Sequence, residues 1–308
     1  MVAETNLTPD NLIQAVILRD EGTPAGPIMA MPGVKRCTVE EAVKIAERAH
    51  AAGVPAVALF PYTEREDRDP NGRLALDPDN LMARAGRAIK KAVPGLGLIG
   101  DVALDPYTDH GHDGLLRDGV ILNDETVAVL TGQALVLADA GYDVVAPSDM
   151  MDGRIGAIRE ALDRKGYEDR MILSYAVKYA SRFYGPYRDA IGSSGVLKGD
   201  KRTYQMDPRN ISEGLREVTL DLAEGADIVM VKPGLPYLDM ITRVKDQFAV
   251  PVAAFQVSGE YAMIACAAAE GAFEFKAVAL ETLWAFRRAG ADMIISYYAA
   301  DAAEWLNG

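Results

Sequence analysis

The chain has 308 residues, of which 49% are hydrophobic and 25% are charged, a composition typical of a folded globular protein with an ample core. Its formal net charge of −13 argues against nucleic acid and against anionic membrane surfaces as partners, although a local basic pocket remains compatible with it. The two cysteines lie far apart, no run of about 18 apolar residues occurs, and the first residues lack a signal-peptide pattern, so we expect a cytoplasmic protein with reduced thiols.

Eight short, apolar and β-branched segments recur along the chain, and their continuous apolar character is typical of parallel strands buried on both faces. We predict strands at 27–31, 54–60, 96–104, 142–147, 170–177, 226–231, 250–257 and 291–297. Helical patterns lie between and after them, at 39–52, 80–92, 124–140, 154–165, 212–224, 237–247, 261–269 and 275–289. Thr38 and Glu41 form a capping box at the first of these helices.

This alternation of strands and helices predicts a (β/α)8 TIM barrel over residues 27–308, preceded by a short N-terminal arm over residues 1–26. An open, doubly wound sheet is the alternative, but no G-x-G-x-x-G motif opens an early helix. Reactive groups of a (β/α)8 barrel lie at the C-terminal ends of its strands. The predicted strand ends carry Asp101, Ser148, Asp149, Lys178, Lys232, Ser258 and Tyr297.

The segment from residue 174 to residue 205 joins a strand to an aromatic and cationic loop. Lys178 ends the strand, Tyr184 and Tyr187 flank a Gly-Pro turn, and a glycine-rich stretch leads to Lys201. Such a segment is typical of a lid that closes over an anionic substrate.

Lys178 and Lys232 end two predicted strands and are candidate amine nucleophiles. A lysine must be neutral to attack a carbonyl, and its ordinary pKa is about 10.4. Burial and a second ammonium nearby both lower that pKa, so a lysine pair at one barrel mouth predicts imine chemistry on a ketone. The alternative is that each lysine forms an ion pair with a carboxylate, such as Asp149 or Asp101.

Residues 101–113 concentrate four aspartates and the pair His110 and His112, a group of side chains able to bind a divalent metal. The only other histidine is His50, on an early helix, which disfavours a metal hydrolase with several imidazole ligands. This stretch contains no cysteine, which excludes a thiolate zinc site there. A hard cation or no metal remains.

Five motifs stand in order along the chain: DVALDPYTDHGHDG at 101–114, APSDMMDGR at 146–154, YAVKYASRFYGPYRD at 175–189, MVKPG at 230–234 and QVSGEY at 256–261. Together they resemble the 5-aminolevulinate dehydratase family, also called porphobilinogen synthase, from about Pro27 to the C-terminus. The resemblance implies a (β/α)8 barrel enzyme, a hydro-lyase of tetrapyrrole (heme) biosynthesis without an organic cofactor. Each site would condense two molecules of 5-aminolevulinate into porphobilinogen with loss of two waters, in a homo-octamer or a homo-hexamer.

The resemblance also implies roles for single residues. Lys232 would form a Schiff base with the P-side substrate, and Lys178 would form one with the A-side substrate. Ser258 and Tyr297 match the pair that binds the P-side carboxylate. The remaining matches are lid and barrel residues around the A-side substrate, namely Arg188, Lys201 and Gln205 for its carboxylate, Tyr184 and Tyr187 as aromatic lid positions, and Asp101, Ser148 and Asp149 near its amine.

Metal use departs from the zinc-dependent members of this family. Those members carry three cysteines where this chain has Ala103, Asp105 and Asp113, which is similar to the aspartate-bearing branch. We therefore expect no catalytic zinc, and Asp105 and Asp113 are candidates either to hold a cation or to orient the A-side amine.

An E-x-x-x-D pattern from Glu217 to Asp221 resembles the family's allosteric magnesium site, and Asp152 upstream also fits it. This makes Glu217 the candidate ligand for an allosteric Mg²⁺ ion. The alternative is a solvated helix face, on which acidic residues four positions apart are common.

Two further functions are alternatives to the dehydratase. A class I aldolase would use Lys232 alone and would leave Lys178 and the cationic lid without a role. An inactive barrel would only bind anions or act as a scaffold for partner proteins.

Overall fold

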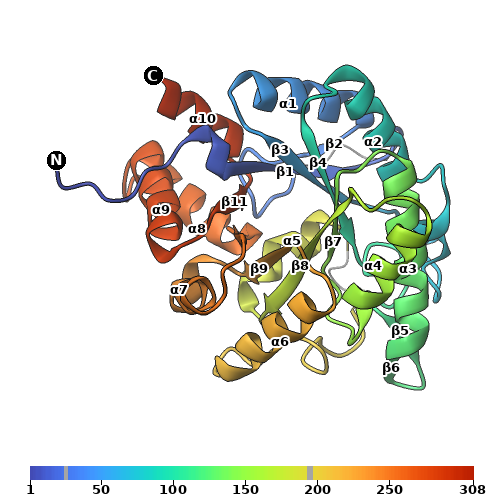
Figure 1. Ribbon diagram of the computed structural model, residues 1–308. Coiled ribbons are helices and arrows are strands. Elements are labelled where there is room, and N and C mark those ends of the chain that lie inside the picture. The colour runs from blue at the N-terminus through green and yellow to red at the C-terminus, as the bar shows by residue number, and fades with distance from the viewer. Residues whose placement is uncertain (24–26, 193–196) are drawn as a thin grey trace.

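Eight parallel strands form a closed barrel in the computed structural model, which describes residues 1–23, 27–192 and 197–308 (Figure 1). The strands in barrel order are β1 (Leu12–Leu18), β3 (Ala56–Pro61), β4 (Gly97–Val102), β7 (Val144–Pro147), β8 (Met171–Lys178), β9 (Ile228–Lys232), β10 (Val252–Phe255) and β11 (Met293–Ser296). β11 pairs with β1 and closes the barrel. The predicted (β/α)8 TIM barrel is confirmed.

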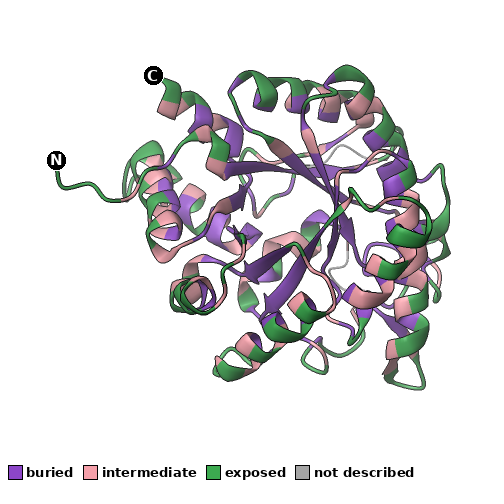
Figure 2. Cartoon of the chain, viewed as in Figure 1, coloured by how far each residue is buried: buried purple, intermediate pink, exposed green. Residues whose placement is uncertain are grey.

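Helices surround the barrel and turn exposed faces outward, while the barrel strands are largely buried (Figure 2). They are α1 (Val39–Ala51), α2 (Leu81–Ala92), α3 (Asn123–Asp139), α4 (Arg154–Arg164), α6 (Ser212–Ala223), α7 (Leu238–Gln247), α8 (Ser258–Ala269), α9 (Phe275–Ala289) and α10 (Ala299–Asn307). α1 begins with the expected capping box, in which the Glu41 amide donates to Thr38 Oγ1 and the Thr38 amide donates to Glu41 Oε2.

The position predicted for the first barrel strand, residues 27–31, is wrong. β1 consists of residues 12–18, all of them buried, and it pairs with β3 and β11. The polar residue Gln14 interrupts the apolar pattern of this strand, yet it is buried because its amide bonds to the backbone of Ala15, Tyr297 and Ala300. The N-terminal arm predicted over residues 1–26 therefore includes a barrel strand, and the barrel begins at β1 rather than at residue 27. Residues 24–26 of the predicted arm lie outside the described residues.

Three aspartates fix the N-terminal end of the barrel. Asp143, Asp227 and Asp292 each precede a strand and accept a hydrogen bond from the backbone amide of a residue in the neighbouring strand. The distances from Oδ2 to these amide nitrogens are 2.7, 2.7 and 2.8 Å, to Leu98, Ile172 and Val252 respectively. These bonds set the strand register at the end of the barrel opposite the lysines.

Several short elements lie outside the predicted pattern. β2 (Arg36–Cys37) pairs with β1, β5 (Leu115–Arg117) and β6 (Val120–Leu122) form a hairpin, and α5 (Gly185–Ala190) contacts α8. The hairpin turns at Asp118 and Gly119, which both have positive φ, as a tight two-residue turn requires. Short 3₁₀ helices are η1 (Pro9–Asn11), η2 (Arg65–Asp67), η3 (Arg73–Leu76), η4 (Arg182–Tyr184) and η5 (Leu235–Tyr237).

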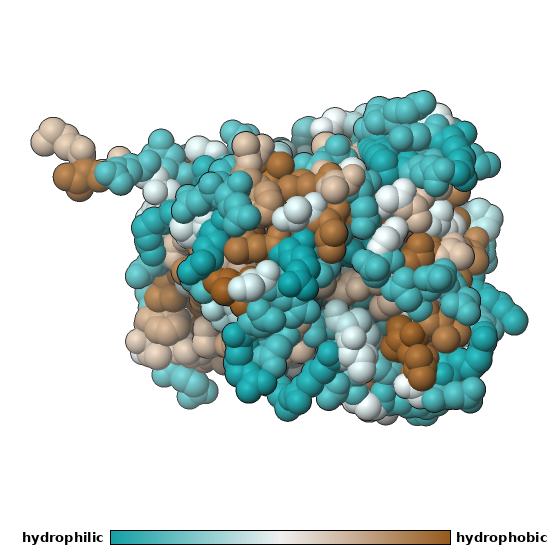
Figure 3. All heavy atoms as spheres, turned by 60° about the horizontal axis from the view of Figure 1, so that its bottom comes forward, coloured by the Kyte–Doolittle hydropathy of each residue, from teal (hydrophilic) through white to brown (hydrophobic). Residues whose placement is uncertain are grey.

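The surface is largely hydrophilic but carries apolar patches on the face shown in Figure 3. Exposed apolar side chains of the described residues include Val120, Met263 and Trp284, which are 60%, 51% and 42% exposed. None of the described helices combines the length and the apolar character that crossing a bilayer requires.

Candidate active site

Lys178 and Lys232 end the neighbouring strands β8 and β9 and are register partners there. The Lys178 ammonium lies 3.2 Å from Asp113 Oδ1 and also donates to the Ser148 carbonyl oxygen. Lys232 has a different environment, because its Nζ lies 4.9–5.5 Å from the ring centroids of Tyr175, Tyr184, Tyr187 and Phe255. Among the ion pairs of the described residues, none involves Lys232.

The environment of Lys232 favours a neutral amine. Burial lowers its pKa most, and the nearby Lys178 ammonium lowers it further, to about 7 from an ordinary value of 10.5. Asp101, Asp105 and Asp113 oppose this shift without cancelling it. Lys178, by contrast, has a carboxylate partner, but this partner is Asp113 rather than Asp149 or Asp101.

Asp113 lies between two lysines. Its Oδ2 is 2.7 Å from Lys201 Nζ and accepts a hydrogen bond from the Tyr204 hydroxyl at 2.9 Å. Burial alone would raise the pKa of Asp113, but the ammonium groups of Lys178 and Lys201 hold it well below its usual range. Asp105 lies 3.0 Å from the same Lys201 ammonium. The two aspartates predicted as cation ligands thus share the ammonium group of Lys201.

Asp101 and Tyr297 each contain a buried polar atom without a hydrogen-bond partner among the described residues, the carboxylate Oδ1 and the phenol oxygen. Burial raises the pKa of Asp101 to about 6, although Lys232 and a hydrogen bond from Ser148 favour its charged form. Asp101 can therefore exchange protons near neutral pH. The Tyr297 hydroxyl can donate to a substrate.

The lid starts with η4 and α5 and continues through residues 197–206, while residues 193–196 lie outside the described residues. The Tyr184 hydroxyl donates to the Lys232 carbonyl oxygen at 3.1 Å. Ser258 Oγ accepts from the Tyr187 amide at 2.8 Å and donates to the Phe183 carbonyl at 3.3 Å. The cavity beneath the lid is lined by Asp105, Asp113, Ser148, Lys178, Tyr184, Tyr187, Arg188, Lys201, Gln205 and Lys232.

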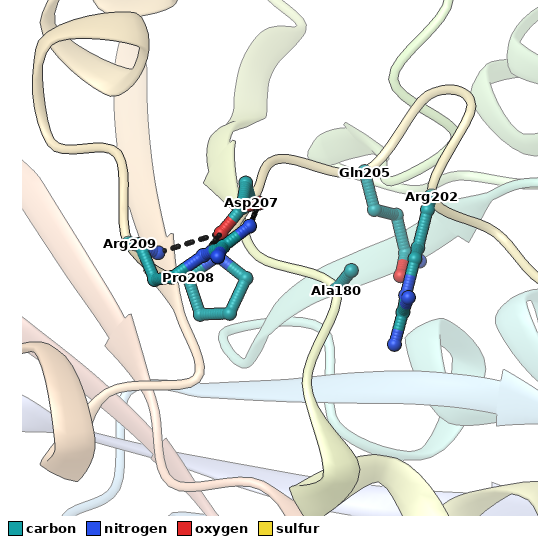
Figure 4. A pocket seen from close by; sticks show the side chains of 6 residues that line it. All are labelled: Ala180, Arg202, Gln205, Asp207, Pro208 and Arg209. Carbon is teal, nitrogen blue, oxygen red and sulfur yellow. Dashed lines mark hydrogen bonds and ion pairs between the residues drawn. The ribbon is translucent and has the colours of Figure 1, made fainter.

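A second hollow lies on the outer side of Gln205, which lines both cavities (Figure 4). Arg202 lies beside Gln205 in this view, and both side chains extend near Ala180. Arg209 donates to the Asp207 carboxylate at 2.6 and 2.9 Å, so much of its charge is compensated locally. Gln205 therefore separates the lysine cavity from an outer hollow that contains two arginines.

Asp149 has contacts that differ from those expected beside a substrate amine. It is fully buried, its Oδ1 accepts from the Met151 amide at 2.7 Å, and its Oδ2 lies 3.6 Å from Arg154 Nε. Burial raises the pKa of Asp149 to about 6. Asp149 is not among the described residues that line the lysine cavity, and its contacts place it in a buried ionic cluster with Arg154.

The predicted magnesium site on α6 does not supply two available carboxylates. Both carboxylate oxygens of Asp221 bond to Arg154, at 3.1 and 3.2 Å, and Ser174 donates to one of them. Burial raises the pKa of Glu217, and the nearby Asp221 and Asp152 raise it further. No cluster of three or more His, Cys, Asp or Glu side chains suited to a metal occurs among the described residues. The Asp221 geometry does not fit the E-x-x-x-D pattern as a ligand pair, and magnesium binding at Glu217 stays a prediction.

Sequence reasoning did not identify Tyr175, Tyr204, Phe255 or Glu260 as functional. Tyr204 lies within the predicted lid, and Glu260 lies within the QVSGEY motif, so both were near recognised signals. Tyr175 and Phe255 lie within predicted strands, where an inward-facing aromatic residue is indistinguishable from core.

Known proteins match this chain over nearly its whole length. A family model described as Delta-aminolevulinic acid dehydratase matches residues 1–305. The delta-aminolevulinic acid dehydratase of Bradyrhizobium diazoefficiens is 59% identical over 306 residues, covering 99% of this chain and 87% of that protein. The Mycobacterium tuberculosis protein of the same description is 48% identical over 308 residues, covering 99% of this chain and 93% of that protein.

A solved structure has the same fold. It is the crystal structure of delta-aminolevulinic acid dehydratase (porphobilinogen synthase) from Toxoplasma gondii ME49 in complex with the reaction product porphobilinogen. The TM-score is 0.96 at 48% sequence identity, and the match covers 99% of this chain and 87% of that chain.

Proposed function

The chain belongs to the delta-aminolevulinic acid dehydratase family, and from this premise we propose that Lys232 and Lys178 carry out the reaction as two Schiff bases. The family match and the full-length relatives confirm the predicted enzyme, which condenses two molecules of 5-aminolevulinate into porphobilinogen and two waters. The roles of single residues below are our proposal.

The observation that carries the proposal is the position of Lys232, which is buried at the end of β9 among four aromatic rings. This environment lowers the pKa of Lys232 to about 7, so the amine is neutral in about half of the molecules at neutral pH. The Nζ lone pair attacks the ketone carbon of the P-side substrate, and the ketone oxygen leaves as water when the C=N bond forms. Asp101, with a pKa near 6, can take up and return the protons of these steps.

Lys178 is the proposed nucleophile for the A-side substrate. Its Nζ bonds to Asp113 and to the Ser148 carbonyl, so this amine must leave both partners before it can attack a ketone. We therefore place the first Schiff base at Lys232 and the second at Lys178. The Lys178 charge also supports the first step, because it lowers the pKa of Lys232.

The two substrate carboxylates have separate candidate partners. Tyr297 directly follows β11 and Ser258 begins α8, and both would bind the P-side carboxylate through their hydroxyl groups once the Ser258 hydroxyl leaves the Phe183 carbonyl. Arg188, Lys201 and Gln205 line the lid side of the lysine cavity and would bind the A-side carboxylate.

Holding both substrates beside their lysines converts a bimolecular condensation into an intramolecular one. This effect is worth up to roughly 7–11 kcal/mol. Tyr184 and Tyr187 cover Lys232 and exclude the water that would hydrolyse its Schiff base.

Porphobilinogen formation by lysine variants tests these roles. We expect Lys232→Gln and Lys178→Gln each to lower kcat by at least about 1,000-fold, because each removes a covalent step. The matched control is Lys245→Gln. Lys245 forms an ion pair with Asp292 at the opposite end of the barrel, away from the proposed site. An aldolase that uses Lys232 alone would retain most of its activity in Lys178→Gln, and that result would refute the two-lysine scheme.

Metal use remains a proposal. We propose that catalysis needs no zinc, because aspartates and an alanine occupy the positions of the family's zinc cysteines, and that magnesium acts only as an allosteric activator at Glu217. Turnover after dialysis against EDTA, with and without added magnesium or zinc, tests both points. Activity that returns only with zinc would contradict the first, and activity that magnesium leaves unchanged would contradict the second.

A homo-octamer or a homo-hexamer is also a proposal, supported by the family resemblance and by the apolar patches on the face shown in Figure 3. Size-exclusion chromatography coupled to light scattering measures the molar mass of the oligomer directly. A monomer at micromolar concentration would contradict it.

A further inference from the structure

Glu260 is a buried carboxylate that the proposed reaction does not use. It lies in the first turn of α8, is 0% exposed, and forms no ion pair with another described residue. Its carboxylate accepts hydrogen bonds from three backbone amides instead: Leu235 at 2.6 Å, Val257 at 2.7 Å and Gly234 at 3.4 Å. Burial raises the pKa of Glu260 to about 8, although the amides favour the charged form. With this pKa the carboxyl group is mostly protonated at pH 7, and backbone amides rather than a cation hold its oxygens.

These amides belong to two different loops at the mouth of the barrel. Gly234 and Leu235 follow Lys232 closely, at the end of β9. Val257 immediately precedes Ser258, after the end of β10. One carboxylate therefore connects the backbone beside the P-side lysine to the backbone beside a candidate ligand of the P-side carboxylate.

The second loop also reaches the lid. Ser258 Oγ bonds to the backbone of Tyr187 and Phe183. A Cβ added at Gly259 would lie 2.4 Å from the Phe183 carbonyl oxygen, which shows how closely the start of α8 packs beneath the lid. Tyr187 in turn lies over the Lys232 amine, with 5.2 Å from Nζ to the ring centroid. The position of α8 thus affects both the backbone of Lys232 and the aromatic cage above it.

We propose that Glu260 is a positioning residue that fixes Lys232 and Ser258 relative to each other for the P-side substrate. It acts through the backbone amides of both loops. This inference rests on the proposed role of Lys232 in the first Schiff base.

Two substitutions separate the carboxyl group of Glu260 from the length of its side chain. Glu260→Gln keeps the length but replaces one acceptor oxygen with an NH2 group, which then faces a backbone donor of one loop. Glu260→Asp keeps the carboxyl group but is one methylene shorter, so we expect that it cannot span both loops. The matched control is Asp227→Asn, which alters a carboxylate that accepts the Ile172 amide at the opposite end of β9.

The experiment measures the rate at which 5-aminolevulinate is reductively trapped on Lys232 by cyanoborohydride, per folded molecule, together with kcat and KM. Since misplacement of a reacting group by about 1 Å can cost up to about 100-fold, we expect both Glu260 variants to lose at least tenfold in trapping rate and in kcat. Asp227→Asn should keep the trapping rate of the parent protein, even if its melting temperature falls.

Trapping at the parental rate in folded Glu260→Gln and Glu260→Asp would overturn the inference. A loss of trapping rate no larger than the fraction of unfolded protein would also overturn it, because a purely structural residue behaves in this way. If Glu260→Gln does not fold, Glu260→Asp decides. If the parent protein itself gives no adduct on Lys232, the proposed role of that lysine fails, and with it the reason for this inference.

Discussion

Replacing Lys178 with glutamine should raise the pKa of Lys232. The Lys178 ammonium is the second cause of the low pKa of Lys232, after burial. Glutamine removes this charge and keeps a donor for the Ser148 carbonyl. The variant therefore measures how much of the reactivity of Lys232 comes from its neighbour.

The expected magnitude follows from the spacing of the strands. Lys178 and Lys232 are register partners on β8 and β9, and neighbouring strands lie about 4.8 Å apart. Taking this strand spacing for the two Nζ atoms, ammonium groups about 5 Å apart repel by roughly 3 kcal/mol at an effective dielectric constant of about 20, which corresponds to roughly two pKa units. Asp113, 3.2 Å from Lys178 Nζ, cancels part of this repulsion. We expect the pKa to rise from about 7 to roughly 8–9, still below the ordinary 10.5 because burial remains.

The assay is the pH dependence of reductive trapping of 5-aminolevulinate on the Lys232 peptide. This step precedes the condensation, so the variant can be measured even if it makes no porphobilinogen. Lys245→Gln removes a lysine from the opposite end of the barrel and should leave the midpoint unchanged.

Two outcomes would refute this explanation. A midpoint that stays near 7 in Lys178→Gln would show that charge repulsion contributes nothing. A midpoint at the ordinary value of 10.5 would show that burial contributes nothing.

Three further predictions follow from the geometry of the site. The kcat/KM of the parent protein should fall about tenfold per pH unit below pH 7, because Lys232 is neutral above its pKa of about 7 and charged below it. A flat profile of kcat/KM from pH 5 to 7 would contradict this. Tyr297→Phe should raise KM about tenfold but shift the melting temperature by less than about 2 °C, since the lost hydroxyl has no partner among the described residues. Lys201→Gln should lower the free energy of unfolding at pH 7 by about 3 kcal/mol, because it leaves the buried Asp105 and Asp113 undercompensated. Urea unfolding measures the last effect, and a loss below about 1 kcal/mol would contradict it.

The sequence predicts most of the barrel because seven of its strands are predominantly apolar segments that alternate with helical patterns. It fails at β1, where Gln14 breaks the pattern and is buried only because residues distant in sequence satisfy its amide. The hairpin of β5 and β6 has a local signal in the sequence, the Asp-Gly pair at 118–119 that is typical of a two-residue turn.

The site could be predicted in part for a similar reason. Strand ends of one barrel meet at one mouth, which places Lys178 beside Lys232 from register alone. The pairing of Lys178 with Asp113 depends on a loop 65 residues earlier in the chain, and no local pattern specifies it. Glu260 resembles an ordinary acidic residue in the first turn of a helix, and only the fold reveals that it bonds to the loop after β9.

The central claim is that two lysines form Schiff bases in a fixed order, and peptide mapping after reduction tests it most directly. The protein would be mixed with isotopically labelled 5-aminolevulinate and cyanoborohydride, and the labelled lysines identified by mass spectrometry. We predict an adduct on Lys232 alone when substrate is limiting, and adducts on both Lys232 and Lys178 when substrate is saturating. Porphobilinogen formation without an adduct on either lysine, or labelling of Lys178 before Lys232, would contradict the account.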